Sequence, residues 1–388
     1  MTGFKKRLAS TALATAMTLT ALPVSVFLIS TDAAAGVPNG FAYTQGTRFM
    51  LDGSPFYYAG TNCYYLTFKS QEAVDNVFKD AEAMGLKVIR VWGNLDVGVK
   101  TGTTDSEGKP VFTNNNDGPG EKDGIYFQYF DKALGKPVTN FGEDGIKKLD
   151  YALYQAEKHG IKLLITFTNY WDAFGGMGQY VKWAEELGIT GLKKDDFYTN
   201  ETLKGWYKDY VNGLLNHTNQ YTGRKLKDEP PVFAWELANE PRCNTDAQCK
   251  DNILYNWAKE MSEYVKSVDP NHMVSLGDEG FYNKPYGYYN EYTTSNYAFY
   301  GAEGVDFEKL MTINTLDFGT PHLYLDQWGM KHTGTGQDDL LWFKIHGETC
   351  AELDKPVILE EFGLTDRTIR DSEYKQWFEV LEGNVYET

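Results

Sequence analysis

The stretch from Trp235 to Cys243, WELANEPRC, decides the fold because it joins a buried strand to a polar edge. Residues 231–234 (PVFA) precede it as a short apolar run, which is typical of a strand buried on both faces. The chain turns polar within a few residues and breaks at Pro241, so Asn239 and Glu240 are expected at the strand's carboxyl end. An unpaired buried carboxylate is costly to desolvate. A glutamate in this position therefore indicates chemistry.

A second stretch has the same construction. Residues 356–359 (PVIL) are apolar, and Glu360, Glu361 and the pair Phe362-Gly363 follow. Neighbouring strand residues point to opposite faces, so only one of the two glutamates is expected to face a substrate. Glu240 and Glu361 lie 121 residues apart, which fits three β/α repeats of about 40 residues and places their strands across the mouth of a (β/α)8 barrel. Two strands that each deliver a glutamate to this edge indicate paired carboxylates that face one substrate.

Three segments together resemble glycoside hydrolase family 5, and more narrowly its secreted fungal-type endo-β-1,4-mannanases. They are WELANEPRC at 235–243, GTPHLY at 319–324 and EEFG at 360–363, and the resemblance runs from about Phe41 to the C-terminus. It implies an α/β fold, the (β/α)8 TIM barrel, and a retaining enzyme that cuts internal bonds of mannan, glucomannan or galactomannan without a cofactor.

The resemblance also implies the catalytic roles. Glu240 matches the acid/base, and Glu361 matches the nucleophile because it immediately precedes the aromatic residue, with Glu360 as its competitor. Glu236 is assigned to the barrel wall. Arg90, in the otherwise apolar run 88–92, is expected to stabilise the nucleophile's anion, to hold the barrel through a buried ion pair, or to do both.

Further residues are expected to contact the sugar. His322 and Tyr324 share one strand face by their two-residue spacing, and Tyr324 is placed to hydrogen-bond Glu361. For the two tryptophans in this set, core packing is the competing interpretation. The remaining expected contacts are Asn239 to the 2-hydroxyl, Arg242 beyond the cleavage point, Glu279 to sugar hydroxyls, and Trp171 and Trp328 as flat faces.

Composition limits the partners. The formal charge of −17 argues against nucleic acid and anionic membrane surfaces, whereas a neutral polysaccharide meets no such repulsion. The six histidines are scattered and form no metal-ligand spacing, so no metal site is predicted. A nucleophile elbow and a phosphate-binding glycine loop are both absent from the sequence.

The N-terminus predicts export. Basic residues 5–7, the mostly apolar run 8–29 and the small residues 33–35 are typical of a signal peptide over residues 1–35, with an uncleaved membrane anchor as the lesser alternative. Removing it takes away three basic residues and one acidic residue, which changes the formal charge from −17 to −19. Residues 36–388 are then expected to be a secreted, extracellular, monomeric barrel domain.

Cysteines and sequons agree with that compartment. Cys243 and Cys249 lie six residues apart and predict a local disulfide, whereas nothing in the sequence brings Cys63 and Cys350 together. Two Asn-X-Thr sequons fit an extracellular surface: Asn200 and Asn216.

The chain supplies seven barrel strands and stops. They are predicted to end near residues 62, 92, 167, 236, 276, 322 and 361. Residues 94–140 are predicted to form a long loop over the barrel mouth rather than a separate domain. An eighth repeat is missing before Thr388, which leaves two unpaired edges and favours a C-terminal truncation over a defective protein.

Two other functions stay open. An endoglucanase of the same family fits the composition and spacing equally well, and the mannan assignment rests on the contexts of Arg242-Cys243 and Trp171. A glycan-binding protein without turnover is the alternative if the barrel is open.

Overall fold

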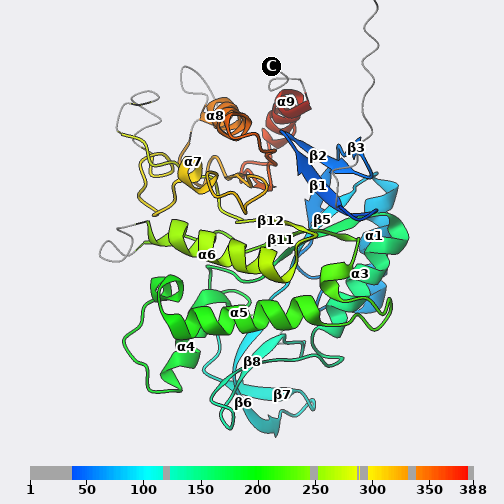
Figure 1. Ribbon diagram of the computed structural model, residues 1–388, viewed down its shortest axis with the longest axis vertical. Coiled ribbons are helices and arrows are strands. Elements are labelled where there is room, and N and C mark those ends of the chain that lie inside the picture. Colours follow the sequence, from blue (N-terminus) through cyan, green and yellow to red (C-terminus); the bar gives the residue numbers. More distant parts are fainter. Residues whose placement is uncertain are drawn as a thin grey trace, which may run out of the picture. The chain divides into compact units, whose positions relative to one another are not determined.

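The computed structural model describes residues 37–116, 123–244, 252–285, 288, 296–330 and 338–382 (Figure 1). The predicted signal peptide lies outside these residues, so it stays a prediction. Among the described residues, no helix combines the length and the apolar character that a membrane crossing needs.

Parallel strands form the centre of the fold at the predicted positions. One sheet has the order β12-β11-β10-β5-β4, and β13 pairs with β14 in parallel. An isolated bridge between Gly319 and Val357 extends that second pair. The strand bounds are β4 Gly60–Asn62, β5 Val88–Trp92, β10 Lys162–Thr166, β11 Val232–Glu236, β12 Met273–Ser275, β13 His322–Leu323 and β14 Glu361–Phe362.

Burial explains why these segments are strands. Every residue of β10 and β11 is buried, as expected for strands covered on both faces by other elements. The register pairs Thr166 of β10 with Glu236, and Glu236 with Ser275 of β12. Polar side chains of neighbouring strands therefore meet at the same edge, and that edge holds the site.

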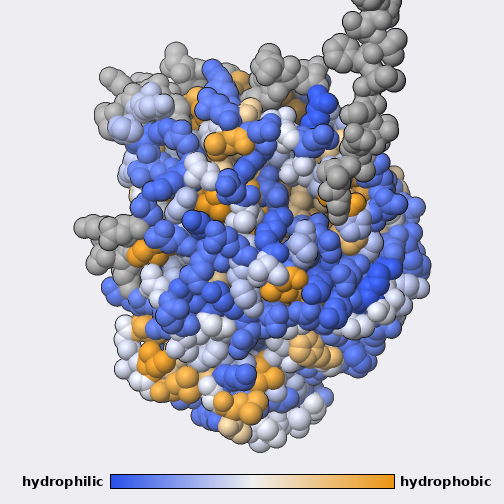
Figure 2. Space-filling model, viewed as in Figure 1, coloured by the Kyte–Doolittle hydropathy of each residue, from blue (hydrophilic) through white to orange (hydrophobic). Residues whose placement is uncertain are grey.

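Helices connect the strands. In α1 (Gln71–Ala83) the Ser70 side chain accepts from the Ala73 amide, Val74 and Phe78 are buried, and the helix stops before Gly85, whose φ is 76°. The other helices are α3 Lys147–His159, α4 Gly176–Glu185, α5 Glu201–Asn216, α6 Ile253–Val268, α7 Phe307–Leu310, α8 Asp338–Glu352 and α9 Arg370–Glu382, with 3-10 turns at Lys194–Tyr198 and Leu226–Asp228. Figure 2 shows one face of the molecule, which is mainly hydrophilic.

An antiparallel hairpin precedes the barrel strands. Strands β1 (Ala42–Gln45), β2 (Arg48–Leu51) and β3 (Ser54–Pro55) form an antiparallel sheet. Its turn at Asp52 and Gly53 has φ values of 49° and 79°, the left-handed pair that a tight hairpin turn requires.

The prediction of a long loop at 94–140 is wrong. Strands β6 (Asp96–Thr104), β7 (Pro110–Thr113), β8 (Gln128–Asp131) and β9 (Lys136–Thr139) form a four-stranded sheet, drawn beside α4 and α5 in Figure 1. A small apolar cluster of Val97, Phe112 and Tyr126 stabilises it. The Trp183 indole of α4 donates to the Val97 carbonyl at 2.9 Å, which anchors the sheet to the helical layer.

Four of the parallel strands end a sheet. In the described part of the chain β4 and β12 end the five-stranded sheet, and β13 and β14 pair only with each other. All three residues of β4 are exposed, and one side-chain bond, from Asn62 Nδ2 to the Glu360 carbonyl at 2.9 Å, links β4 to the residue before β14. The absence of an eighth repeat and truncation before it stay predictions.

The cysteine predictions are partly tested. Cys243 is disulfide-bonded, and its predicted partner Cys249 lies outside the described residues. Cys63 and Cys350 are free and buried. The sequon residue Asn200 caps α5 and Asn216 ends it, and glycosylation of either stays a prediction.

Candidate active site

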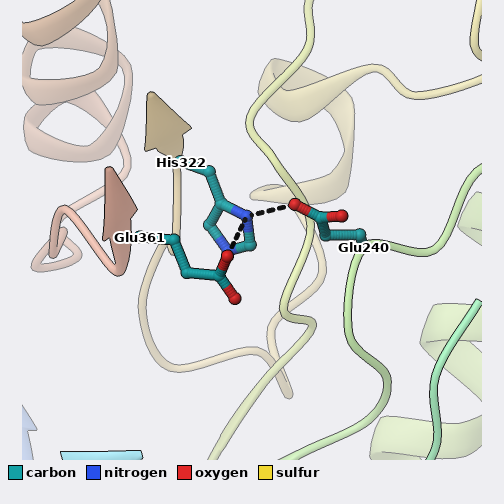
Figure 3. Close-up of side chains that lie close together, drawn as sticks. All are labelled: Glu240, His322 and Glu361. Atoms are coloured by element: carbon teal, nitrogen blue, oxygen red, sulfur yellow. Dashed lines mark hydrogen bonds and ion pairs between the residues drawn. The ribbon is translucent and has the colours of Figure 1, made fainter. Parts of the chain in front are cut away.

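Glu240 and Glu361 converge on one imidazole. Glu240 follows β11, Glu361 opens β14, and His322 of β13 lies between them (Figure 3). His322 Nδ1 is 2.8 Å from Glu240 Oε1 and 3.8 Å from Glu361 Oε2. One ligand atom from each of the three residues lies within 4.8 Å of the others. This spacing is close to the roughly 5–5.5 Å that retaining glycosidases use.

Glu240 occupies a strained backbone position. Its φ is 47°, a left-handed value that is uncommon for a residue other than glycine. The Glu240 amide donates to the Gly277 carbonyl at 2.8 Å, and the Trp171 indole donates to Glu240 Oε2. Strain of this kind clusters at functional sites, where surrounding contacts maintain it.

Glu361 is held as an anion. Arg90 Nη1 donates to its Oε1, and the predicted bond from the Tyr324 hydroxyl to Oε2 is present at 2.7 Å. Burial alone would raise the pKa of Glu361, but His322, Arg90 and Tyr324 together lower that pKa to about 2. An ionised carboxylate at this position suits a nucleophile.

Arg90 combines both predicted roles. It contacts Glu361 and also donates from Nη2 to Glu236 Oε1 at 2.6 Å and to Asn239 Oδ1 at 2.7 Å. Glu236 lies in the barrel wall, as predicted, at the end of β11. Its carboxylate is fully buried and accepts from Arg90 and from Thr166 Oγ1 at 2.6 Å, so it joins the buried network beneath Glu240 and Glu361.

Glu360 lies behind His322. It is 8% exposed, and its Oε2 lies 3.0 Å from His322 Nε2 and 3.4 Å from Arg90 Nε. Both Glu360 and Glu361 thus reach Arg90, which strict alternation did not predict, because β14 is only two residues long. Glu361 lines the adjacent pocket and Glu360 does not, so the geometry favours Glu361 as the group that meets a ligand.

His322 is charged. Its two ring nitrogens each face a carboxylate, Glu240 and Glu360. Burial would lower the pKa of the imidazole, but Glu361, Glu240 and Glu360 raise it well above its usual value. The resulting cation between carboxylates explains why a buried histidine lies at the centre of the site.

A second cluster flanks Glu240. Arg242 donates from Nε to Glu279 at 2.7 Å and from Nη1 to Glu303 at 3.1 Å, and its Cζ lies 5.1 Å from the Trp171 ring centroid. Burial and then the nearby Glu240 raise the pKa of Glu279 to about 8, although Arg242 opposes this shift. Trp171 is 39% exposed and offers a surface to a ligand. Sugar contacts by Asn239, Arg242 and Glu279 stay predictions.

Trp328 is a core residue. It is 7% exposed and packs among Phe281, Tyr324 and Trp342, with ring centroids 4.9–6.0 Å away. The expectation of a flat face for sugar is therefore corrected to core packing.

A pocket of about 220 Å³ opens beside Glu361. Its lining includes Tyr64, which is 52% exposed, and Trp92 at the end of β5. Neither was expected at the site from the sequence, although Trp92 ends β5 and Tyr64 lies two residues after β4. The full lining is Asn62, Tyr64, Arg90, Val91, Trp92, Tyr324 and Glu361.

Metal-ligating side chains gather once in the part of the chain that the structure describes, at Glu240, His322 and Glu361. Arg90 and the charged imidazole already place two positive charges against these carboxylates. The group can therefore carry out acid–base and nucleophilic chemistry with its own charges, and we assign no metal to it.

Comparisons with known proteins agree on one family. Residues 39–384 match the family model described as GH family 5 beta-mannosidase-like. The chain is 39% identical to probable mannan endo-1,4-beta-mannosidase F of Aspergillus oryzae over 325 residues, covering 84% of this chain and 60% of that protein. It is 38% identical to probable mannan endo-1,4-beta-mannosidase A of Aspergillus flavus over 333 residues, covering 85% and 74%.

Solved structures give the same result. The endo-1,4-beta-mannanase of Rhizomucor miehei superposes with a TM-score of 0.75 at 37% identity, covering 88% of this chain and 87% of that one. The endo-beta-1,4-mannanase of Thermotoga petrophila gives a TM-score of 0.71 at 38% identity, covering 86% and 66%. Although the chain spans only 60% of the length of the first of the curated relatives, it belongs to the β-mannosidase-like group of glycoside hydrolase family 5.

Proposed function

We propose that the chain is a retaining endo-β-1,4-mannanase that hydrolyses internal bonds of mannan, glucomannan or galactomannan. The observation that carries the proposal is the approach of Glu240, His322 and Glu361 to within 4.8 Å of one another. The relatives named as mannan endo-1,4-beta-mannosidases support mannan as the substrate class.

Two displacements at the anomeric carbon follow from this arrangement. Glu361 attacks that carbon while Glu240 gives its proton to the leaving oxygen, which forms a mannosyl ester on Glu361 and frees the first product. Glu240 then takes a proton from water, the hydroxide oxygen bonds to the anomeric carbon, and Glu361 leaves as a carboxylate. The net configuration is retained because each step inverts it.

Neighbouring residues support the two steps. Arg90 and Tyr324 hold Glu361 ionised for attack. Asn239, which Arg90 and Asn169 orient, is placed to bond the 2-hydroxyl. Trp171 is the proposed flat surface for a sugar next to the cleavage point.

Export and a monomeric state belong to the same proposal. The disulfide at Cys243 supports an oxidising compartment. The acidic charge of the chain supports a neutral polysaccharide, rather than nucleic acid, as the partner.

Release of reducing ends from pure mannan and from soluble cellulose tests the function. We expect the full chain to cut mannan, and Glu361→Ala to bind mannan without cutting it. Cleavage of cellulose alone would replace the proposal with an endoglucanase. Mannan binding by the unmodified chain without any cleavage would replace it with a glycan-binding protein. Retained turnover by Glu361→Ala would transfer the nucleophile role to Glu360.

A further inference from the structure

Four carboxyl groups surround two cations at the site. The cations are Arg90 and His322, and both lie in the barrel interior. Two of the carboxyls, Glu240 and Glu361, belong to the proposed reaction. The other two, Glu236 and Glu360, have no role in it, although both are buried and both contact Arg90.

Glu236 and Glu360 lie against the same nitrogen. Arg90 Nε is 3.2 Å from both oxygens of Glu236 and 3.4 Å from Glu360 Oε2. The two carboxyl groups therefore share one donor and are neighbours. Two adjacent buried carboxylates repel each other, so one of them is expected to keep its proton.

The hydrogen-bond partners of the four oxygens of Glu236 and Glu360 indicate which oxygen carries the proton. Oε2 of Glu360 faces His322 Nε2 and Arg90 Nε, but its Oε1 is buried and has no hydrogen-bond partner. Glu236 Oε1 already accepts from Arg90 and Thr166, whereas Oε2 accepts only from Arg90 Nε at 3.2 Å. A proton on Glu236 Oε2 would donate to Glu360 Oε1 and satisfy the orphaned atom.

We infer that Glu236 is a neutral carboxylic acid that donates a hydrogen bond to Glu360 and so positions Arg90 and His322 beneath the catalytic pair. Glu236 touches no substrate and is a positioning residue. The inference rests on the proposed function for its kinetic consequence only.

A proton on Glu236 leaves the charges of the buried network balanced. With Glu236 neutral, Arg90 and His322 balance Glu360 and Glu361, and Glu240 is left as the one carboxyl that gains and loses a proton. Burial, and then the neighbouring Glu360, raise the pKa of Glu236 to about 8, although Arg90 opposes the shift. The other groups that face this pair are Thr166, Tyr58, Tyr207, Asp278, His322 and Glu361.

Infrared absorption of the full chain tests the inference without any turnover. Two protonated carboxyls that are lost near pH 8 are expected in the unmodified protein, on Glu236 and Glu279, and Glu236→Gln should lose the first, so that the absorption titrating near pH 8 becomes weaker. Asp96→Asn is the matched control, because Asp96 is a buried carboxyl outside the site whose pKa burial raises to about 7. That variant should keep the component that titrates near pH 8. A weaker component in Asp96→Asn, or one of full strength in Glu236→Gln, would overturn the inference.

Stability gives a second readout. A folded-state pKa of about 8 against an ordinary 4.5 means that the unmodified protein loses stability as the pH rises through this window. A glutamine at 236 does not titrate. The urea midpoint of Glu236→Gln minus that of the unmodified protein should therefore increase as the pH is raised from about 5 to about 8. A constant difference across that window would contradict the inference.

Kinetics separates positioning from mere packing. Glu236→Gln keeps a donor for Glu360 and should hold kcat/KM on mannan within about tenfold, whereas Glu236→Ala should lose at least about a hundredfold. Glu360→Gln turns an amide donor toward His322 or Arg90 and should resemble Glu236→Ala. Equal losses in Glu236→Gln and Glu236→Ala would overturn the inference. Absence of any mannan hydrolysis by the unmodified chain would count against the proposed function alone, because the infrared and stability results do not depend on it.

Discussion

Tyr324→Phe removes one hydrogen bond from the proposed nucleophile and little else. The Tyr324 hydroxyl donates to Glu361 Oε2 at 2.7 Å, and its ring packs 6.0 Å from Trp328 and against Gly363. Phenylalanine keeps the ring contacts. After the change, Arg90 still donates to Glu361, and His322 stays 3.8 Å from Oε2 without a hydrogen bond to it.

The size of the effect follows from the charge on Glu361. A hydrogen bond to a charged group contributes roughly 1.5–3 kcal/mol, which corresponds to a loss of roughly 10- to 150-fold in kcat/KM. Tyr324 also lowers the pKa of Glu361, so its removal should move the acid limb of the pH–rate profile to higher pH. Initial rates on soluble mannan across the acid range measure both effects.

A matched control is Tyr264→Phe, because the Tyr264 hydroxyl also donates one bond, to the Lys208 carbonyl at 3.2 Å in the helical layer. Its kcat/KM should stay within about twofold of the unmodified protein. The reasoning is refuted if Tyr324→Phe loses less than about threefold and its acid limb does not move.

Three further predictions concern Trp171, Arg242 and Glu361. Trp171→Phe removes the indole donor to Glu240 and should lower kcat on mannan by about tenfold, and an unchanged kcat would show that this bond is dispensable. Arg242→Ala leaves the buried Glu279 without its cation and should lower the free energy of unfolding in urea by about 3 kcal/mol, whereas a loss below about 1 kcal/mol would contradict the pairing. The lowered pKa of Glu361 stabilises the fold above its ordinary value of 4.5, and that contribution is lost as the pH falls toward 2. The urea midpoint of Glu361→Gln should therefore approach that of the unmodified protein over this range, and parallel curves would count against an ionised Glu361.

The sequence predicts the barrel strands well because their physics is local. Continuous apolar runs such as residues 232–235 favour buried strands, and each becomes polar where the strand ends. The same reasoning places Glu240, Glu361 and Arg90 at one edge. Tyr324 is also found, since a two-residue spacing from His322 keeps both on one face.

Other features depend on contacts that no local pattern reveals. The β6–β9 sheet was missed because Asp96–Thr104 is rich in glycine and threonine and is buried over only its first half. Trp328 was misplaced because a tryptophan near a strand end fits a sugar platform or a core equally well, and only its neighbours Phe281 and Trp342 decide. The network that joins Glu236 to Glu360 requires strands far apart in sequence to meet at Arg90.

Covalent trapping tests the central claim most directly. A 2-fluoro-mannobiosyl fluoride slows both displacements but speeds the first through its leaving group, so the glycosyl ester accumulates on the nucleophile. Peptide mass mapping of the full chain should locate that ester on Glu361. An ester on Glu360, or turnover with inverted products and no ester, would contradict the assignment of Glu240 and Glu361 as the acid/base and nucleophile.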